Sequence, residues 1–319
     1  MNSRSGSHGI RRMSLPLTAF LTAFIRLKDA SSPGRKLRIL NPLLNGPYLP
    51  SPDPAKLPRI IWCYWDQGYE NAPEIVKYCL ASWKRHNPTW DVRFLTSETV
   101  SAYVDTVEMD AIFQKSTHFD FPRALYSDFL RLKLLQTYGG VWVDATLLCT
   151  CPLDMWLHTL MPSGVFMFQR TIDNSCPVAS FFIAAQKNNS LITRWLKIFQ
   201  SYLSKHKLLS IYYAFESAIR RYRSIQAYFV LHYILDFLIK FDRPSRLIFC
   251  TMPSLDANRL GLLQNWAASG GSGGGGQGQK SSSEATLPDL TGIPIHKLSW
   301  KLGITVSDIE RALSHQPRI

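Results

Sequence analysis

The first feature of this sequence that suggests chemistry is an apolar run that ends in a carboxylate. Residues 141–143 are apolar throughout, Gly139 and Gly140 precede them, and Asp144 follows them directly. In an open parallel sheet, ligands bind outside the carboxyl ends of the strands, so a charged residue at that point lies where a site is expected. A carboxylate there can hold a divalent cation that neutralises a diphosphate leaving group. The alternative is an aspartate that only caps the next turn.

Three polar residues precede this strand on a predicted helix. Asp128 and Arg131 are three residues apart and Ser127 and Arg131 are four apart, so they share one helix face. A carboxylate beside a guanidinium can fix a sugar hydroxyl, while the arginine contacts phosphate through two parallel hydrogen bonds. The alternative is a surface ion pair, which contributes roughly 0.3 to 0.5 kcal/mol.

The two patterns together resemble the signature of a known family. Ser-Asp-Phe-Leu-Arg at 127–131 and Tyr-Gly-Gly-Val-Trp-Val-Asp-Ala-Thr at 138–146 resemble the motifs of glycosyltransferases with a DXD sugar-binding motif. The Asp-Ala-Thr form is similar to the capsular polysaccharide synthesis branch, as are the first predicted strand and the block 296–301. The resemblance extends from about Pro58 to Lys301. It implies a nucleotide diphosphate sugar donor and a divalent cation, Mn²⁺ or Mg²⁺.

The resemblance also implies roles for single residues. Asp144 would contact the metal or the donor ribose, while Asp128 and Arg131 would bind the donor sugar and its phosphate side. These three form the predicted catalytic set. Ser127 and Gly140 are further predicted donor-binding positions.

The predicted nucleotide pocket and metal site involve other residues. The resemblance places Trp62 and Trp65 in the nucleotide pocket. Thr146 stands where the commoner motif has a second aspartate, and its neutral hydroxyl would hold a metal more weakly, or a third ligand must help. His296 is a candidate for that ligand, because a neutral imidazole suits manganese. The alternative is a surface histidine in a basic tail.

Phosphate neutralisation and proton transfer have further candidates. Lys297 or Lys301, in the same C-terminal block, can neutralise phosphate. No carboxylate in the second half has a spacing that marks it as a catalytic base, and Asp173, Glu216 and Asp236 all stay open. If the chain retains anomeric configuration as related families mostly do, the donor phosphate itself would accept the proton.

Periodicity predicts an α/β chain. Residues 59–65 form a first buried strand, a helix opened by a capping box of Asn71 and Glu74 runs to about His86, and residues 90–96 form a second strand. Ser97 opens another short helix, and a helix from Pro122 to Gly139 precedes strand 141–143. We expect a GT-A-like (Rossmann-like), mostly parallel sheet with helices on both faces and a helical second half. In this second half, the sequence pattern predicts helices from Leu191 to Phe241, followed by a strand-like stretch at 246–250.

Composition limits the classes of partner. The 319 residues carry a formal charge of +13, so an anionic partner is expected, but the chain has no zinc-finger spacing and no basic recognition helix. Nucleic acid is therefore not expected as a partner. A basic aromatic stretch with Arg220, Arg221, Arg223 and Lys240 indicates either a membrane surface or lipid-linked acceptor site, or an amphipathic core helix. The six cysteines are expected to be core thiols.

One folded domain with an elaborated second half is expected, preceded by an N-terminal segment and linker. Residues 1–57 hold an apolar segment too short and too rich in proline to cross a bilayer, followed by a proline-rich linker. Residues 58–319 form the GT-A-like domain, with a mobile Gly/Ser loop at 269–283. The apolar segment is either a signal core or an interfacial helix, so the compartment stays open between the cytoplasmic face of a membrane and the Golgi lumen.

The expected function is transfer of a hexose from a nucleotide diphosphate sugar to a glycan or lipid-linked acceptor, in polysaccharide or cell-surface glycan synthesis. Two alternatives remain. One is a non-catalytic protein that binds sugar nucleotides or polysaccharide, motivated by Thr146. The other is a peripheral membrane scaffold, motivated by the N-terminal apolar segment and the net charge.

Overall fold

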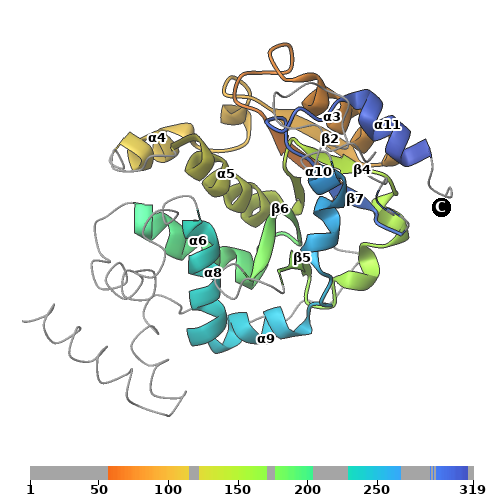
Figure 1. Cartoon of the computed structure of the whole chain (residues 1–319). Coiled ribbons are helices and arrows are strands. Elements are labelled where there is room, and N and C mark those ends of the chain that lie inside the picture. Colours follow the sequence, from red (N-terminus) through yellow and green to blue (C-terminus); the bar gives the residue numbers. More distant parts are fainter. Residues whose placement is uncertain are drawn as a thin grey trace, which may run out of the picture.

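The central element of the fold is a five-stranded sheet. The computed structural model describes residues 57–114, 122–170, 177–203, 229–266, 288, 290 and 292–314. The strand order is β2-β1-β3-β6-β5, with β1 (Ile60–Tyr64), β2 (Asp91–Leu95), β3 (Gly140–Val143), β5 (Val165–Gln169) and β6 (Val178–Ala185). A second sheet pairs β4 (Leu147–Cys149) with β7 (Ile295–Lys297). Helices cover both faces of the large sheet, so the expected α/β class is confirmed (Figure 1).

The first part of the chain forms the predicted parallel unit. Strands β1 and β2 are parallel neighbours, and α3 (Glu74–His86) connects them. Helix α3 buries Val76, Leu80 and Trp83, as the spacing predicts. The predicted capping box is wrong: the residue before the helix is Pro73, which offers no side-chain cap, and the Asn71 amide donates to the Gln67 carbonyl oxygen instead.

The sheet is mixed, whereas a mostly parallel sheet was expected. Strand β1 is parallel to β2 and β3, but β6 is antiparallel to both β3 and β5. Strands β5 and β6 follow each other closely along the chain, and antiparallel neighbours need no crossover helix. Seven of the eight residues of β6 are buried, as its continuous apolar run requires for a strand inside a sheet.

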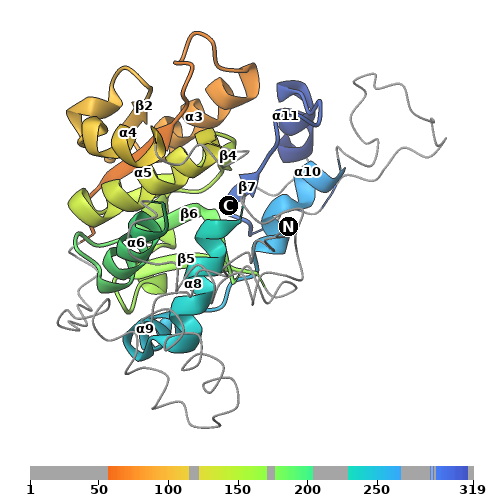
Figure 2. The same cartoon turned by 90° about the vertical axis from the view of Figure 1, so that its left-hand side faces the viewer.

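Alternating side chains of the strands build one apolar core on each face. Trp62 and Trp142 face the core shared with α5 (Pro122–Tyr138), α6 (Ser190–Leu203) and α8 (Val230–Phe241). Ile61 and Val143 face the opposite core, which includes residues of α3, α10 (Leu262–Trp266) and α11 (Val306–Ser314). In Figure 2, α5 and α6 lie on one side of β5 and β6, and α10 and α11 lie on the other.

The strand-like stretch at 246–250 is part of a helix, so that prediction is wrong. Helix α9 runs from Arg243 to Thr251, and the Asp242 carboxylate caps it by accepting a hydrogen bond from the Ser245 backbone N–H at 3.1 Å. Pro244 lies in its first turn, where proline is tolerated because that N–H has no helical partner. A capping aspartate followed by proline is a helix start, and this local signal outweighs the apolar run.

Shorter elements complete the described parts. These are α4 (Thr106–Gln114) and the 3-10 turns η2 (Val100–Ala102), η3 (Leu153–Met155), η4 (His158–Leu160) and η6 (Ala257–Gly261). The short helix expected after Ser97 is the single turn η2. Across the described residues, no helix combines the length and the apolar character that crossing a bilayer requires.

Several expectations fall outside the described residues. They concern the N-terminal segment up to residue 56, Asp173, Glu216, the arginines at 220, 221 and 223, Cys176, and the loop at 269–283. Of the other cysteines, Cys63, Cys79, Cys149 and Cys151 are buried free thiols, as expected. Cys250 is exposed, which corrects that expectation for this one residue.

Candidate functional site

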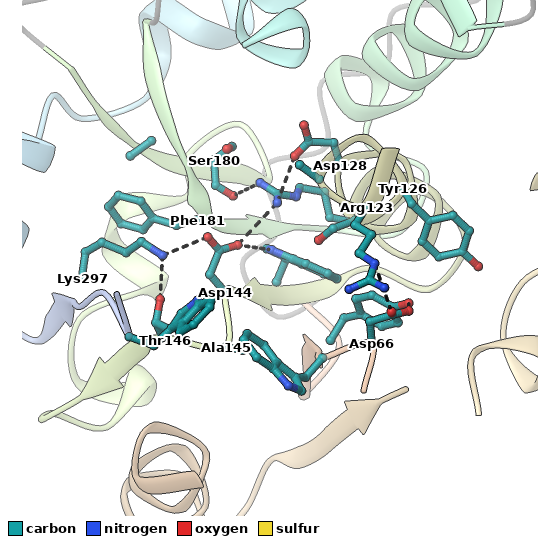
Figure 3. A pocket seen from close by; sticks show the side chains of 18 of the residues that line it. Asp66, Arg123, Tyr126, Asp128, Asp144, Ala145, Thr146, Ser180, Phe181 and Lys297 are labelled. Carbon is teal, nitrogen blue, oxygen red and sulfur yellow. Dashed lines mark hydrogen bonds and ion pairs between the residues drawn. The ribbon is translucent and has the colours of Figure 1, made fainter. Parts of the chain in front are cut away.

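A cavity of about 1470 Å³ opens at the carboxyl ends of β1 and β3. This is the edge at which the strand rule places a ligand site. Most of the residues selected from the sequence line it, namely Trp65, Ser127, Asp128, Arg131, Asp144, Thr146 and Lys297. Figure 3 shows Asp144 near the centre, with Lys297 on one side of it and Asp128 on the other.

The paired glycines allow the strand that carries Asp144 to take its place. Gly139 and Gly140 have φ of +73° and +101°, conformations that residues with a side chain rarely adopt. A Cβ on Gly140 would lie 2.5 Å from the Ile60 carbonyl oxygen, and one on Gly139 would lie 2.6 Å from the Lys187 backbone nitrogen. The glycines therefore bring the start of β3 tightly between its neighbours, and Asp144 follows at the other end.

Asp144 is held by charged partners on both sides. Its Oδ1 lies 3.4 Å from the Arg131 guanidinium and accepts a hydrogen bond from Trp142 Nε1 at 3.1 Å. Its Oδ2 accepts from Lys297 Nζ at 3.1 Å. Burial acts to raise the pKa of Asp144, but Lys297 and Arg131 outweigh it and lower the pKa to about 2. Asp144 is thus a fixed carboxylate at neutral pH.

Arg131 connects the helix residues to the strand. It lies 3.0 Å from Asp128 Oδ1 and donates to the Ser180 carbonyl oxygen at 2.7 Å, and its plane lies over the Trp142 ring. Only 6% of its side chain is exposed, so this pair is buried and not the surface ion pair that spacing alone allows. Its Nε is buried with no hydrogen-bond partner among the described residues. An unsatisfied buried donor is costly, and this one belongs to a side chain that lines the cavity.

Asp128 has the opposite electrostatic character from Asp144. Burial raises the pKa of Asp128 to about 7, against the opposing effect of Arg131. Near neutral pH its carboxyl group therefore exchanges a proton. As a hydrogen-bonding group it can both donate and accept, which suits a sugar hydroxyl.

Lys297 joins the C-terminal block to the motif. Strand β7 pairs with β4 so that Lys297 is the partner of Leu147, and the Leu298 N–H donates to the Thr146 carbonyl oxygen at 3.0 Å. Lys297 Nζ donates to Thr146 Oγ1 at 2.9 Å and lies 5.5 Å from the centre of the Phe181 ring. The tail thus folds back over the motif.

His296 does not lie with Asp144 and Thr146. Successive residues of a strand face opposite sides, so in β7 a lysine that lines the cavity turns its histidine neighbour away. His296 is fully buried and is not among the residues that line the cavity. Burial lowers its pKa to about 4, and neither ring nitrogen has a hydrogen-bond partner in the described parts of the chain. The geometry does not support His296 as a metal ligand.

Two further predicted positions also lie away from the cavity. Trp62 is fully buried, packs against Tyr103 and Tyr138, and donates to the Gly139 carbonyl oxygen at 2.9 Å, so it is a core residue and not a wall of the nucleotide pocket. Gly140 lies at the start of β3, whereas the site is at the end of that strand. Its role is steric, so its prediction as a donor contact is corrected.

The residues predicted to hold a divalent cation do not fit that role in this arrangement. Lys297 Nζ lies between the Asp144 carboxylate and the Thr146 hydroxyl, where the cation would be expected. Two unit charges about 4 Å apart interact by roughly 4 kcal/mol at an effective dielectric constant near 20, and a divalent ion would double that repulsion. Within the described ranges, no group of three or more His, Cys, Asp or Glu residues is placed to bind a metal.

Sequence reasoning missed several lining residues. Asp66 is the second residue after β1, close to the end of a buried strand as Asp144 is, so the same strand rule could have found it. It lies 3.7 Å from the Arg123 guanidinium. Phe181 and Ser180 belong to β6, which was not predicted as a strand. Lys301 lines the cavity as expected. Asp236, one open candidate for the base, pairs with Lys240 on α8 and does not line it.

The comparisons with known proteins match the part of the chain that carries most of these residues. The family model described as "Capsular polysaccharide synthesis protein" matches residues 48–222, which include β3, α5 and most of the cavity's charged residues. The chain is 30% identical over 167 residues to "O-glycosyltransferase braB" of Annulohypoxylon truncatum, covering 48% of this chain and 39% of that protein. It is 30% identical over 156 residues to "Glycosyltransferase afumC" of Aspergillus fumigatus, covering 45% and 40%.

Among solved structures, "PaToxG Glycosyltransferase" aligns with 70% of this chain and 97% of its own chain, at 16% identity and a TM-score of 0.37. The aligned parts span only about two fifths of the length of the two fungal relatives.

Proposed function

We propose that this chain, which belongs to the capsular polysaccharide synthesis protein family, is a glycosyltransferase that takes its sugar from a nucleotide diphosphate sugar. The observation that carries the proposal is the convergence of Asp144, Asp128, Arg131 and Lys297 on one cavity at the carboxyl edge of the sheet. Two carboxyl groups beside two cations suit a ligand that combines hydroxyl groups with phosphates. The names of the fungal relatives support the same class of reaction.

The donor's parts match different members of this network. Asp144, which stays ionised, accepts hydrogen bonds from a sugar or ribose hydroxyl. Asp128 and Arg131, which both line the cavity, bind the transferred hexose. Lys297 contacts the diphosphate as a point charge. Trp65, which also lines the cavity, offers an apolar surface for the base.

In the reaction, the bond between the anomeric carbon and the diphosphate oxygen breaks, and its electron pair stays on the oxygen. A bond forms between the anomeric carbon and an acceptor oxygen, and the acceptor's proton passes to the departing diphosphate. Fixed cations beside the developing charge stabilise such a transition state more than the ground state, because they need no reorganisation.

The acceptor is proposed to be a hydroxyl group on a glycan or a lipid-linked molecule. The relative braB is named an O-glycosyltransferase, which supports transfer to oxygen. The second half of the chain contributes uncharged amide side chains to the cavity, namely Asn258, Gln264 and Asn265. Amides donate and accept hydrogen bonds, as hydroxyl recognition requires. The formal charge of +13 supports contact with an anionic membrane surface during synthesis of polysaccharide or cell-surface glycans.

Incubation with a panel of nucleotide diphosphate sugars and hydroxyl acceptors tests the proposal. We expect one donor to release nucleoside diphosphate and the acceptor to gain the mass of one hexose residue, measured by mass spectrometry. The Asp144→Asn variant should abolish both signals, while Asp91→Asn, a change in an exposed residue outside the cavity, should leave them unchanged. Donor binding without release or transfer would favour a non-catalytic sugar-nucleotide-binding protein.

A further inference from the structure

Thr146 stands where the commoner motif has its second aspartate, and the ammonium group of Lys297 lies beside it. Lys297 Nζ lies 2.9 Å from Thr146 Oγ1 and 3.1 Å from Asp144 Oδ2, so an ammonium group lies between the two side chains that would flank a metal ion. We infer that Lys297 takes the place of the divalent cation, so that this chain binds the donor diphosphate without a metal. This inference rests on the proposed function, because it concerns the same donor.

The backbone of Lys297 is fixed beside the motif, which keeps its ammonium group within reach of Asp144 and Thr146. Strand β7 is paired with β4 through three residue pairs, and the pair Leu147–Lys297 is one of them. Beside it, the Leu298 N–H donates to the carbonyl oxygen of Thr146 itself. The segment that carries the lysine and the segment that carries the threonine are therefore one hydrogen-bonded unit.

The ammonium group remains able to contact a ligand. It has three N–H donors, and the contacts with Asp144 and Thr146 use two of them. Its side chain is 27% exposed and lines the cavity, so the third donor can reach a phosphate oxygen. The Phe181 ring face lies 5.5 Å from Nζ and supports the charge further.

With both carboxyl groups ionised, Lys297 balances the net negative charge that Asp128, Asp144 and Arg131 would otherwise carry together. Asp128 and Asp144 oppose Arg131 and Lys297, which leaves this group neutral or, with Asp128 protonated, positive. A second aspartate at position 146 would make the group more negative and favour a divalent cation. Threonine adds no charge and accepts the lysine's hydrogen bond. The lysine and the threonine thus act as a matched pair.

Two more cations line the same cavity and can share the diphosphate charge. Arg170 and Lys301 make no ion pair within the part of the chain that the structure describes, and both contribute to the cavity wall. Lys301 lies over the Trp300 ring. When the anomeric bond breaks and its electron pair goes to the diphosphate oxygen, these side chains and Lys297 would neutralise the charge that a metal ion neutralises elsewhere.

Calorimetric titration of the full chain with UDP, and separately with GDP, tests the inference. Each titration is run in EDTA and again in excess MnCl₂. We expect one of the two nucleotides to bind in EDTA, with a Kd within about twofold of its value in MnCl₂. The loss of Mn²⁺ electron paramagnetic resonance signal reports metal binding directly, and the wild type should cause none at submillimolar Mn²⁺ without nucleotide.

Three variants connect the result to Lys297. Lys297→Met keeps the length of the side chain without its charge, and should weaken nucleotide binding in EDTA by roughly ten- to a hundredfold, the loss expected for a charged hydrogen bond. Lys297→Arg should retain most of the binding. Lys84→Met, at an exposed lysine near the end of α3, is the matched control and should change nothing. With the ammonium removed, Lys297→Met should also bind Mn²⁺ more tightly than the wild type does.

The outcomes separate the inference from the function on which it rests. Nucleotide binding in EDTA that falls in Lys297→Met supports both. Nucleotide binding by the wild type only with Mn²⁺ overturns the inference while the proposed donor class stands, and this comparison needs no variant that must fold. Equal affinity of the wild type and a folded Lys297→Met in EDTA also overturns the inference. Binding of neither nucleotide in either condition contradicts the proposed donor class itself.

Discussion

The cavity wall contains two unlike groups of residues. Asp128, Arg131, Asp144 and Lys297 form a charged group, here named the charged side, and Asn258, Gln264 and Asn265 from η6 and α10 form an uncharged group, here named the amide side. On the charged side nearly every polar group is engaged and Arg131 is 6% exposed, whereas on the amide side Asn265 is an exposed, uncharged residue. Buried ion pairs hold their geometry before a ligand arrives, and such preorganisation favours one fixed ligand. In the proposed function the charged side therefore binds the donor and the amide side selects the acceptor.

The largest expected effect comes from removing the charge at the centre of the charged side. Asp144→Asn leaves the side chain the same size but frees Lys297 and Arg131 from their common partner. We expect kcat/KM with the donor to fall by about 10³-fold, as when a preorganised electrostatic contact is lost. Steady-state assay of nucleoside diphosphate release measures it. If kcat/KM falls by less than about tenfold while the melting temperature is unchanged, Asp144 does not have the central role in donor binding proposed for it.

The next effect concerns stability. Arg131→Met should lower the free energy of unfolding by about 3 kcal/mol, because it leaves the buried Asp128 without its cation. Urea unfolding monitored by tryptophan fluorescence measures the loss. The double variant with Asp128→Asn should recover part of it, because the stranded carboxylate is then gone. Additive losses would show that the two side chains do not interact, contrary to the 3.0 Å contact.

The pH dependence of stability should distinguish the two aspartates. The pKa of Asp128 is raised from 3.8 to about 7, so between these values the folded state holds a proton that the unfolded state has released. Stability from this group is therefore present at low pH and is lost as the pH rises towards 7, with a slope of at most about 1.4 kcal/mol per pH unit. Asp144, whose pKa is lowered to about 2, loses its contribution only below pH 4.

His296 acts in the opposite direction in part of this range, so a difference measurement is needed. Because its pKa is lowered to about 4, the unfolded state binds a proton there below about pH 6.5 that the folded state does not, and stability falls as the pH falls. The unfolding free energy of the wild type minus that of Asp128→Asn should therefore decrease from pH 5 to pH 8. A flat difference would contradict the buried, proton-exchanging state of Asp128.

The smallest expected effect lies on the amide side. Asn265→Ala should raise the KM for the acceptor by roughly three- to tenfold, the loss of one neutral hydrogen bond, and should leave donor affinity unchanged. Bisubstrate kinetics separates the two. If the change weakens the donor and not the acceptor, the assignment of the two sides is reversed.

The charged side could largely be predicted from the sequence because its signals are local. Asp144 follows an apolar strand, and Asp128 and Arg131 share a helix face at a spacing of three residues. The contact between Lys297 and Asp144 joins residues 153 positions apart through a pairing of β4 with β7. The candidate roles of His296 and Lys297 both place the C-terminal block at the motif. Which of the two faces the cavity could not be predicted, because a shift of one residue reverses the side chain that faces it.

The errors have physical reasons of the same kind. Trp62 lies in the first strand, which resembles that of the family. Because side chains alternate along β1, Trp62 points into the core, where its indole N–H donates to the Gly139 carbonyl oxygen. The apolar strand β6 was missed because a continuous apolar run gives no periodicity that separates strand from helix. Helix α9 was read as a strand because apolar content was weighed above the capping aspartate at 242.

The position of a bound donor tests the account most directly. A crystal structure of the full chain with a nucleotide diphosphate sugar, or a non-hydrolysable analogue, would locate the ligand against both sides of the cavity. We predict that the diphosphate lies within hydrogen-bonding distance of Lys297, with the hexose between Asp128, Arg131 and Asp144 and its anomeric carbon open towards the amide side. A donor bound elsewhere, or a metal ion between Asp144 and the diphosphate with Lys297 displaced, would contradict it.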